Sequence, residues 1–253
     1  KEPIEKTLFV IPRPEYIDEN FKTLTKGIRY EVFNNELKLM INPEMDFRFP
    51  LWVDPSLRAD ADADVILDGQ SAGDLFGSTV ASAGDFNGDG IEDFLVGAIG
   101  DNNDSGQGNA GRVFIFFGSI NGTKRADADA DVILNGQSGA NRFGSSAASV
   151  GDFNGDGKSD VIVGSFNDDD GASSSNSGSV YIFFGGITGN KTARTDADVI
   201  IDGQSAADEF GHSVASAGDF NGDGKDDVII GAPSDDNNSN NNPGSAFIFF
   251  GGI

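Results

Sequence analysis

Short apolar runs separated by polar, glycine-rich stretches recur along most of this chain. Runs of about five residues with glycine nearby favour β-strands over helices. In the first unit of the pattern they lie at 65–67, 94–98 and 113–117. Equivalent runs in the later units lie at 132–134, 180–184, 199–201, 228–233 and 246–250. Because the two longer runs of each unit are apolar throughout, we expect strands that are buried on both faces.

The runs belong to a repeat of about 67 residues. Asp-Gly or Asn-Gly dipeptides after the first run of each unit predict tight turns, and a Phe-Gly pair follows each turn. Four short antiparallel strands per unit, covered on both faces by neighbouring units, are typical of a β-propeller blade. The predicted fold is therefore all-β, with three blades. The three repeats occupy about 60–123, 127–190 and 196–253.

An acidic loop recurs every 67 residues, at 85–93, 152–160 and 219–227. Its first copy reads Asp-Phe-Asn-Gly-Asp-Gly-Ile-Glu-Asp. Oxygen-bearing side chains stand at positions 1, 3, 5 and 9, which suits a hard cation, because calcium takes about six to eight oxygen ligands. The glycine at position 6 permits the positive φ of a tight turn. The pattern predicts one metal site in each repeat.

Three ordered motifs carry a resemblance to a known family. The Phe-Gly pair, the acidic loop and an ending such as Gly231-Ala232-Pro233 resemble FG-GAP repeats, the blades of integrin α-subunit propellers and their bacterial relatives. In that family the loop joins the first two strands of a blade and holds calcium. The resemblance implies about three Ca²⁺ ions, with position 7 contributing only its carbonyl and varying freely in side chain. The implied ligands are Asp85, Asn87, Asp89, Ile91 and Asp93, then Asp152, Asn154, Asp156, Lys158 and Asp160, then Asp219, Asn221, Asp223, Lys225 and Asp227.

Other structures share features of these loops. Loops of Asp, Asn and Gly also occur as solvated turns without metal. EF-hand and dockerin-like loops carry similar donors but need helical flanks. The EF-hand also needs a carboxylate at position 12, where this chain has Val96, Val163 and Ile230. Strand flanks and threefold recurrence therefore favour calcium-binding loops of propeller blades.

Three repeats fall short of the roughly four to eight blades of closed propellers. The resemblance implies that the strand before each Phe-Gly pair is the outermost strand of the preceding blade. Strand 132–134 then completes the first blade and 199–201 the second, whereas 65–67 has no blade before it. The third blade has no outer strand up to Ile253. Unpaired strand edges are normally covered, so we expect a partner for this one.

Residues 1–53 are predicted to form a β-rich segment separate from the repeats in 54–253. A short strand at 8–11 and a hairpin of 28–33 with 36–41 are its expected elements. We consider three roles for it: a divergent fourth blade, a cap, or a strand donor to the third blade of a neighbouring copy. Donation between copies is heterologous and yields a ring or an open filament.

Two tracts share the run Arg-Ala-Asp-Ala-Asp-Ala-Asp, at Arg58–Asp64 and Arg125–Asp131. In an extended chain the three aspartates of each run lie on one face. One role for them is to gather further cations; the role that we expect is to keep an outer edge soluble and to discourage unwanted strand pairing.

The charge balance of the chain limits the classes of molecule that it can bind. The chain has 41 Asp and Glu against 17 Lys and Arg, a net charge of -24, which disfavours nucleic acid and anionic membranes and favours cations. Cysteine is absent, which excludes disulfides and thiolate metal sites. No apolar run approaches the ~20 residues of a membrane span. A calcium protein of modest affinity suits a secreted, extracellular or cell-surface location.

These observations predict an extracellular calcium-binding structural or interaction protein that forms homo-oligomers head to tail, by strand or blade complementation. The alternative is an adhesion or ligand-binding module of a longer chain, with a protein or carbohydrate ligand. An enzyme is not expected. The sole histidine, His212, stands where Ser78 and Ser145 occur in the other units, and no nucleophile elbow, phosphate loop or zinc motif is present.

Overall fold

Strands dominate the computed structural model, and the chain divides into two compact units, Lys1–Leu57 and Arg58–Ile253. In the first unit the structure describes the backbone of three strands. In the second it describes residues 63–102, 108–137, 141–169, 176–236 and 243–252.

The first unit contains a small antiparallel sheet in the order β1-β3-β2, made of β1 (Ile11–Pro12), β2 (Ile28–Phe33) and β3 (Glu36–Ile41). Phe33 pairs with Glu36, which leaves two residues for the turn, as the predicted hairpin requires. Residues 8–10 of the other expected strand lie outside the described residues. The role of this unit as blade, cap or donor stays a prediction.

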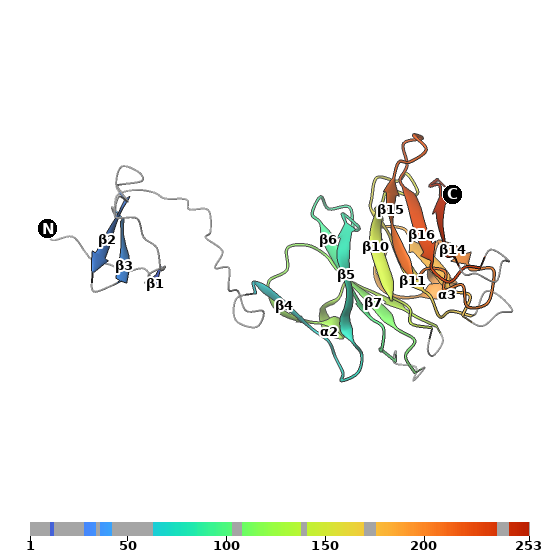
Figure 1. Ribbon diagram of the computed structural model, residues 1–253, viewed down its shortest axis with the longest axis horizontal. Coiled ribbons are helices and arrows are strands. Elements are labelled where there is room, and N and C mark those ends of the chain that lie inside the picture. The colour runs from blue at the N-terminus through green and yellow to red at the C-terminus, as the bar shows by residue number, and fades with distance from the viewer. Residues whose placement is uncertain are drawn as a thin grey trace. The chain divides into compact units, whose positions relative to one another are not determined.

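The second unit is a row of antiparallel blades (Figure 1). The first contains β5 (Phe76–Gly84), β6 (Asp93–Ala98), β7 (Arg112–Phe116) and β9 (Val132–Asn135). The second contains β10 (Ser146–Gly151), β11 (Asp160–Ser165), β12 (Ser179–Phe183) and β14 (Val199–Asp202). The third contains β15 (Ser213–Gly218), β16 (Asp227–Ala232) and β17 (Ser245–Phe249). The expected all-β, propeller-type blades are confirmed.

The outer strands lie where the repeat phase predicts. β9 precedes the second Phe-Gly pair in sequence but pairs with β7, and β14 likewise pairs with β12. Within the described residues β17 has one strand neighbour, β16. A further strand, β4 (Val65–Asp68), belongs to none of the three blades.

Connectors between blades add strands that sequence reasoning did not predict. After the third strand of a blade, the chain forms β8 (Gly122–Arg125) in the first repeat and β13 (Gly189–Thr192) in the second. β8 pairs in parallel with β4, and β13 pairs in parallel with β9. Each connector therefore joins the outer strand that precedes its own blade.

A one-turn helix follows each connector strand: α2 (Ala126–Asp129) and α3 (Ala193–Asp196). The tract Arg125–Asp131 is therefore not extended throughout, and its three aspartates do not lie on one face of a strand. The carboxylate of Asp129 accepts a hydrogen bond from the backbone N–H of Arg125 at 2.7 Å, which favours the turn. Ala126 is 1% exposed and packs in the core, so the tract is partly buried.

The hydrophobic core lies between the blades. Leu95 and Ile115 of the first blade pack in one cluster with Phe183 of the second. Phe153 and Ile182 of the second blade share another cluster with Val228 of the third. Every residue of β7, β11 and β12 is buried, which agrees with burial on both faces.

On its other face, the first blade packs Phe114 and Phe116 with Leu67 of β4. In the cluster between the first two blades, Leu134 of β9 is the residue that corresponds to Leu67 in the repeat. β4 therefore lies against the first blade as β9 lies against the second.

Candidate metal centre

The three acidic loops connect the first and second strands of their blades, and their glycines bend the chain. Gly88 and Gly90 have φ of 81° and 86°, in the region that side chains disfavour. The glycines at positions 4 and 6 of the other two loops also have positive φ. Glycine is thus required at position 4 as well as at the predicted position 6.

The side chains at positions 1, 3 and 5 fold back onto their own loop. The Asp85 carboxylate accepts hydrogen bonds from the N–H groups of Gly88 and Gly90, both at 2.9 Å. Asn87 Oδ1 accepts from the N–H of Asp89 at 2.7 Å, and Asp89 Oδ1 accepts from the N–H of Ile91 at 2.8 Å. The same bonds recur in the second and third loops. Each loop therefore gathers the oxygens of these three side chains in one tight turn.

The carboxylate at position 9 is buried, unlike the others. Asp93 is 2% exposed, and its Oδ2 accepts from the N–H groups of Phe86 at 3.0 Å and Asn87 at 3.1 Å. Its Oδ1 accepts from Gly118, at the end of the third strand, at 2.8 Å. Asp160 and Asp227 hold their loops in the same way. Position 9 thus anchors the acidic loop to its blade.

Burial disfavours the charged form of this carboxylate. Burial raises the pKa of Asp160 to about 6, and the negative charges of Asp156 and Asp152 add to the rise, although backbone hydrogen bonds oppose it. Burial also raises the pKa of Asp93, with Asp89 contributing. A cation in the loop would offset this repulsion between carboxylates.

The donor chemistry fits calcium. Each loop offers carboxylate oxygens at positions 1, 5 and 9, an amide oxygen at position 3 and a carbonyl at position 7, with no nitrogen or sulfur ligand among them. All fifteen predicted positions lie within the described residues, and each repeat places its five in one loop. The assignment of the individual ligands stays a prediction.

Sequence reasoning missed that successive loops are joined to each other. The N–H of Ser159 donates to the carbonyl of Asp85 at 3.1 Å, and the N–H of Asp226 donates to that of Asp152 at 3.2 Å. Asp226 also accepts from the N–H of Asp152 at 2.9 Å. The acidic loops are therefore part of the junctions between blades.

The side chain at position 7 also lies at the junction between successive loops, which the sequence analysis did not foresee. The stem of Lys158 lies over the preceding loop, where a Cβ at Gly88 would be 3.1 Å from its Cε. Lys225 lies over Gly155 in the same way. Ile91, in the first loop, is 44% exposed. The sequence feature that could have indicated this contact is the lysine at position 7, which occurs only in the two repeats that follow another acidic loop.

A second group of carboxylates lies outside the loops. Asp208, Asp235 and Asp236 of the third repeat have oxygens within 4.8 Å of one another. The sequence analysis did not single out this group.

The comparisons with known proteins agree with the fold and the loops. Residues 76–116, 143–183 and 210–249 match the FG-GAP repeat. These segments begin at the three Phe-Gly pairs and contain the three acidic loops. The chain belongs to the FG-GAP repeat family.

Two classes of relative match the chain. It is 37% identical to integrin alpha-PS5 of Drosophila melanogaster over 175 residues, which are 66% of this chain and 16% of that protein. It is 36% identical to phosphatidylinositol-glycan-specific phospholipase D of Bos taurus over 162 residues, 60% of this chain and 18% of that protein. Integrin alpha-5 of Xenopus laevis is 31% identical over 65% of this chain and 15% of its own length. The chain thus spans less than a fifth of each of these relatives. None of the helices in its described part is long and apolar enough to cross a membrane.

Proposed function

We propose that this chain is a calcium-stabilised propeller module that binds a ligand or a partner protein outside the cell. Each acidic loop holds one Ca²⁺ through side chains at positions 1, 3, 5 and 9 and the carbonyl at position 7. The ion neutralises carboxylates that otherwise repel one another and fixes the loop. The membership of the FG-GAP family, and the integrins among the relatives, support this function.

The bonds between successive loops carry the proposal. Because Ser159 and Asp226 donate to the loops that precede them, an ion that orders one loop also stabilises the junction with the next blade. Metal binding then contributes directly to the free energy of folding. Extracellular sites of this kind have dissociation constants of roughly 10⁻⁴–10⁻³ M, which suits the calcium concentration outside cells.

Removal of calcium is the test. At calcium 100-fold above its dissociation constant, each site stabilises the fold by about 2.7 kcal/mol, so chelation should lower the melting temperature sharply. Calorimetric titration should give about one ion per acidic loop. Asp156→Ala should remove one ion and reduce the calcium-dependent gain, while leaving melting in chelator nearly unchanged. Equal melting with calcium and with chelator would refute the proposal.

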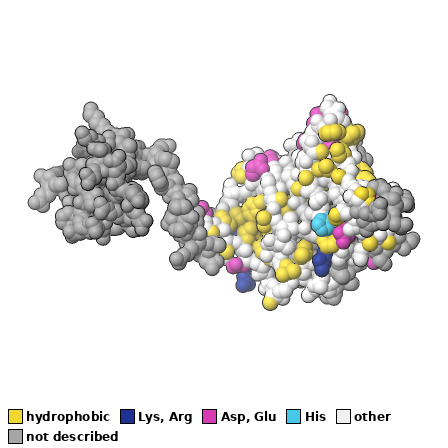
Figure 2. Space-filling view, in the orientation of Figure 1, with side chains coloured by type: hydrophobic (Ala, Val, Ile, Leu, Met, Phe, Trp, Pro, Cys, Tyr) yellow, Lys and Arg dark blue, Asp and Glu magenta, His cyan; other side chains and the backbone are white. Residues whose placement is uncertain are grey.

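A second candidate function is head-to-tail self-association, and the two ends of the row of blades favour it. Apolar side chains reach the surface over both the first and the third blade (Figure 2). Phe220 is 65% exposed on the third blade, whereas its equivalents Phe86 and Phe153 are fully buried between blades. The β4 of one copy would then complete the third blade of another. Further repeats of a longer chain would cover the same surfaces.

Mass measurement in solution distinguishes the two arrangements. Self-association predicts oligomers whose size grows with protein concentration and which dissociate in chelator. A monomer at all concentrations, with calcium-dependent melting retained, would remove the second candidate and leave the first intact.

A further inference from the structure

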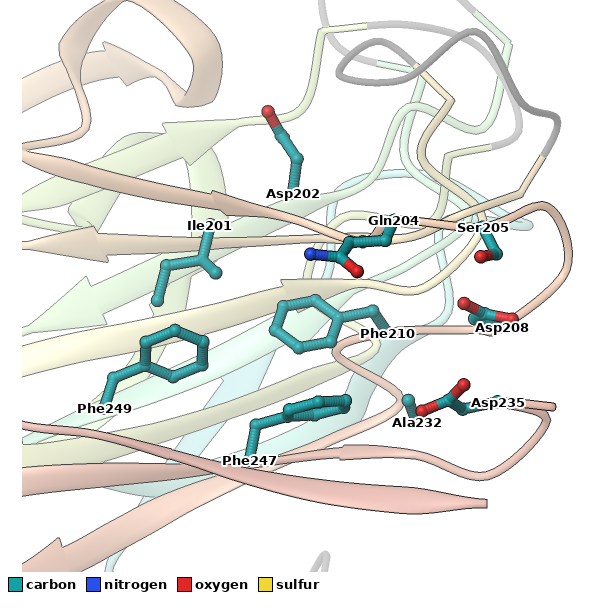
Figure 3. A pocket seen from close by; sticks show the side chains of 11 residues that line it. Ile201, Asp202, Gln204, Ser205, Asp208, Phe210, Ala232, Asp235, Phe247 and Phe249 are labelled. Carbon is teal, nitrogen blue, oxygen red and sulfur yellow. The ribbon is translucent and has the colours of Figure 1, made fainter. Parts of the chain in front are cut away.

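A cavity lies beside the third strand of the third blade, and Ile201 and Asp202 of β14, the outer strand of the second blade, also line it (Figure 3). The rings of Phe210, Phe247 and Phe249 line one end, and the carboxylates of Asp208 and Asp235 lie at the other. Asp208 and Asp235 are 7% and 8% exposed. Within the part of the chain that the structure describes, no lysine or arginine lines this cavity. The other two blades show what such a place normally holds.

In the first blade the equivalent acid, Asp101, faces an arginine from the blade itself. Arg112 opens β7, and its Nε lies 3.4 Å from Asp101 Oδ1. Arg112 Nη1 also lies 3.2 Å from Asp127 Oδ1, on helix α2. Here the strand supplies the guanidinium and the connector helix supplies a carboxylate.

In the second blade the two positions are exchanged. Ser179 opens β12, and the connector helix α3 supplies Arg194. Arg194 binds Asp202 through two nitrogen–oxygen contacts of 2.6 and 3.1 Å and also bonds Tyr181. The hydroxyl of Tyr181 in turn donates to the buried Asp168 at 2.5 Å. Each complete blade therefore has one guanidinium near this edge: Arg112 pairs with the acid after the second strand, whereas Arg194 pairs with Asp202 of its own outer strand and reaches Asp168 through Tyr181.

The third blade resembles the second blade at the start of its third strand, but it carries the two acids of the first blade. Its third strand opens with Ser245, as in the second blade, so no arginine comes from that position. Asp208 and Asp235 correspond to Asp74 and Asp101 of the first blade, and Phe247 has no hydroxyl to donate. Burial and the charges of Asp235 and Asp236 raise the pKa of Asp208. A cation from a connector would relieve this repulsion.

The path of such a connector is also preserved. After β17, the N–H of Gly251 donates to Asp227 at 2.9 Å and that of Gly252 donates to the Phe153 carbonyl at 2.7 Å. The N–H of Gly185 donates to Asp160 at 2.9 Å in the same manner after β12, where the chain goes on to β13 and α3. A segment arriving beside β17 would therefore follow the route that α3 and β14 take on the second blade.

We propose that this cavity and the adjoining edge of β17 bind an outer-strand segment whose connector helix carries a basic residue in the place of Arg194. The inference rests on the proposed propeller module, whose third blade further repeats of a longer chain would complete, and it argues against the second candidate, in which β4 of another copy does so. The segment of a second copy does not meet the requirement. Its sequence has Asp60 at the position of Arg194, which would add a carboxylate to the cavity.

Three fluorescent peptides test the proposal against the full chain in calcium. The first has the sequence of residues 187–202, the second is the same with Arg194→Asp, and the third has the sequence of residues 53–68. Fluorescence anisotropy should give the first peptide an affinity at least about 10-fold higher than that of either acidic peptide, equivalent to about 1.4 kcal/mol.

Ser245→Arg provides the matched control, because it restores the strand guanidinium of the first blade. In this variant the order should reverse, with both acidic peptides binding more tightly than the first. Its melting temperature with and without calcium should stay close to that of the unchanged chain, which shows that the fold is intact. If a folded variant binds the acidic peptides more tightly than the basic one, the charge of the bound segment determines its affinity for the cavity.

Three outcomes would overturn the inference. Equal affinity for the Arg194 peptide and its Asp version would mean that the edge adds a strand without reading charge, which leaves the proposed function intact. Tighter binding of the 53–68 peptide would make a second copy the occupant. Absence of binding by all three peptides at millimolar concentration would mean that the cavity is no docking site.

Discussion

The third strands of the second and third blades have nearly the same sequence but different surroundings. β12 reads Ser-Val-Tyr-Ile-Phe and is buried at every position, whereas β17 reads Ser-Ala-Phe-Ile-Phe and is exposed or half-buried throughout. β12 has β14 along its edge, and Ile182 packs against the third blade. β17 has neither within the described residues. Whether a strand is buried therefore depends on its neighbouring blades. Its own sequence only makes burial possible.

Alanine substitutions at Phe153 and Phe220 should show the largest difference in stability between the second and third blades. They occupy the same position of successive acidic loops, but Phe153 is fully buried and Phe220 is 65% exposed. Phe153→Ala should lower the free energy of unfolding by about 3–5 kcal/mol through lost burial and a cavity. Phe220→Ala should change it by less than about 0.5 kcal/mol. Denaturant unfolding in calcium measures both, and a large cost at Phe220 would show that the end of the third blade is covered in solution.

Tyr181 of β12 and Phe247 of β17 allow the same two strands to be compared by exchanging a single hydroxyl group. Tyr181→Phe removes a buried hydroxyl that donates to the Asp168 carboxylate, so it should cost about 1.5–3 kcal/mol. The matched change Phe247→Tyr adds a hydroxyl to a ring that is 36% exposed and should change stability by less than about 0.5 kcal/mol. Thermal melting of both variants is the measurement. Equal effects would contradict the difference in burial that the two strands show.

Lys158 offers the smallest test, at the junction of the acidic loops. Lys158→Ala removes the stem that covers Gly88 and should cost about 0.5 kcal/mol. Ile91→Ala, at the same position of the first loop, should have no measurable effect, because Ile91 is 44% exposed. If the lysine served only as a surface charge, Lys158→Gln would restore nothing beyond the alanine variant. Recovery with Gln, which keeps part of the stem, would support packing.

Local sequence patterns were sufficient for the apolar strands of the blades, and the resemblance to FG-GAP repeats supplied the phase of the repeats. The Val-Ile-Leu runs predicted β9 and β14, and the Phe-Gly pairs marked the blade starts. Apolar runs in β7 and β12 predicted burial on both faces because such runs are stable only between two layers. All three acidic loops could be located from the sequence, because the spacing of their acidic residues is set within nine residues of chain.

Contacts between distant parts of the chain could not be predicted in this way. The pairing of β13 with β9 joins strands 57 residues apart in register, and nothing within Gly189–Thr192 is apolar enough to suggest a strand. Helix α2 was not predicted, because its alternating Ala and Asp have the period of a strand and not that of a helix. The exchange of Arg112 for Arg194 became visible only once the blades were placed side by side.

The parallel pairing of β13 with β9 has a consequence for dissection of the chain. Residues 189–192 follow the third strand of the second blade but complete the sheet of the first, so the sheet boundaries do not coincide with the repeat boundaries. No single cut frees the first blade with all of its strands. Hydrogen exchange should accordingly show the first two blades opening together, as one cooperative unit of two interlocked sheets.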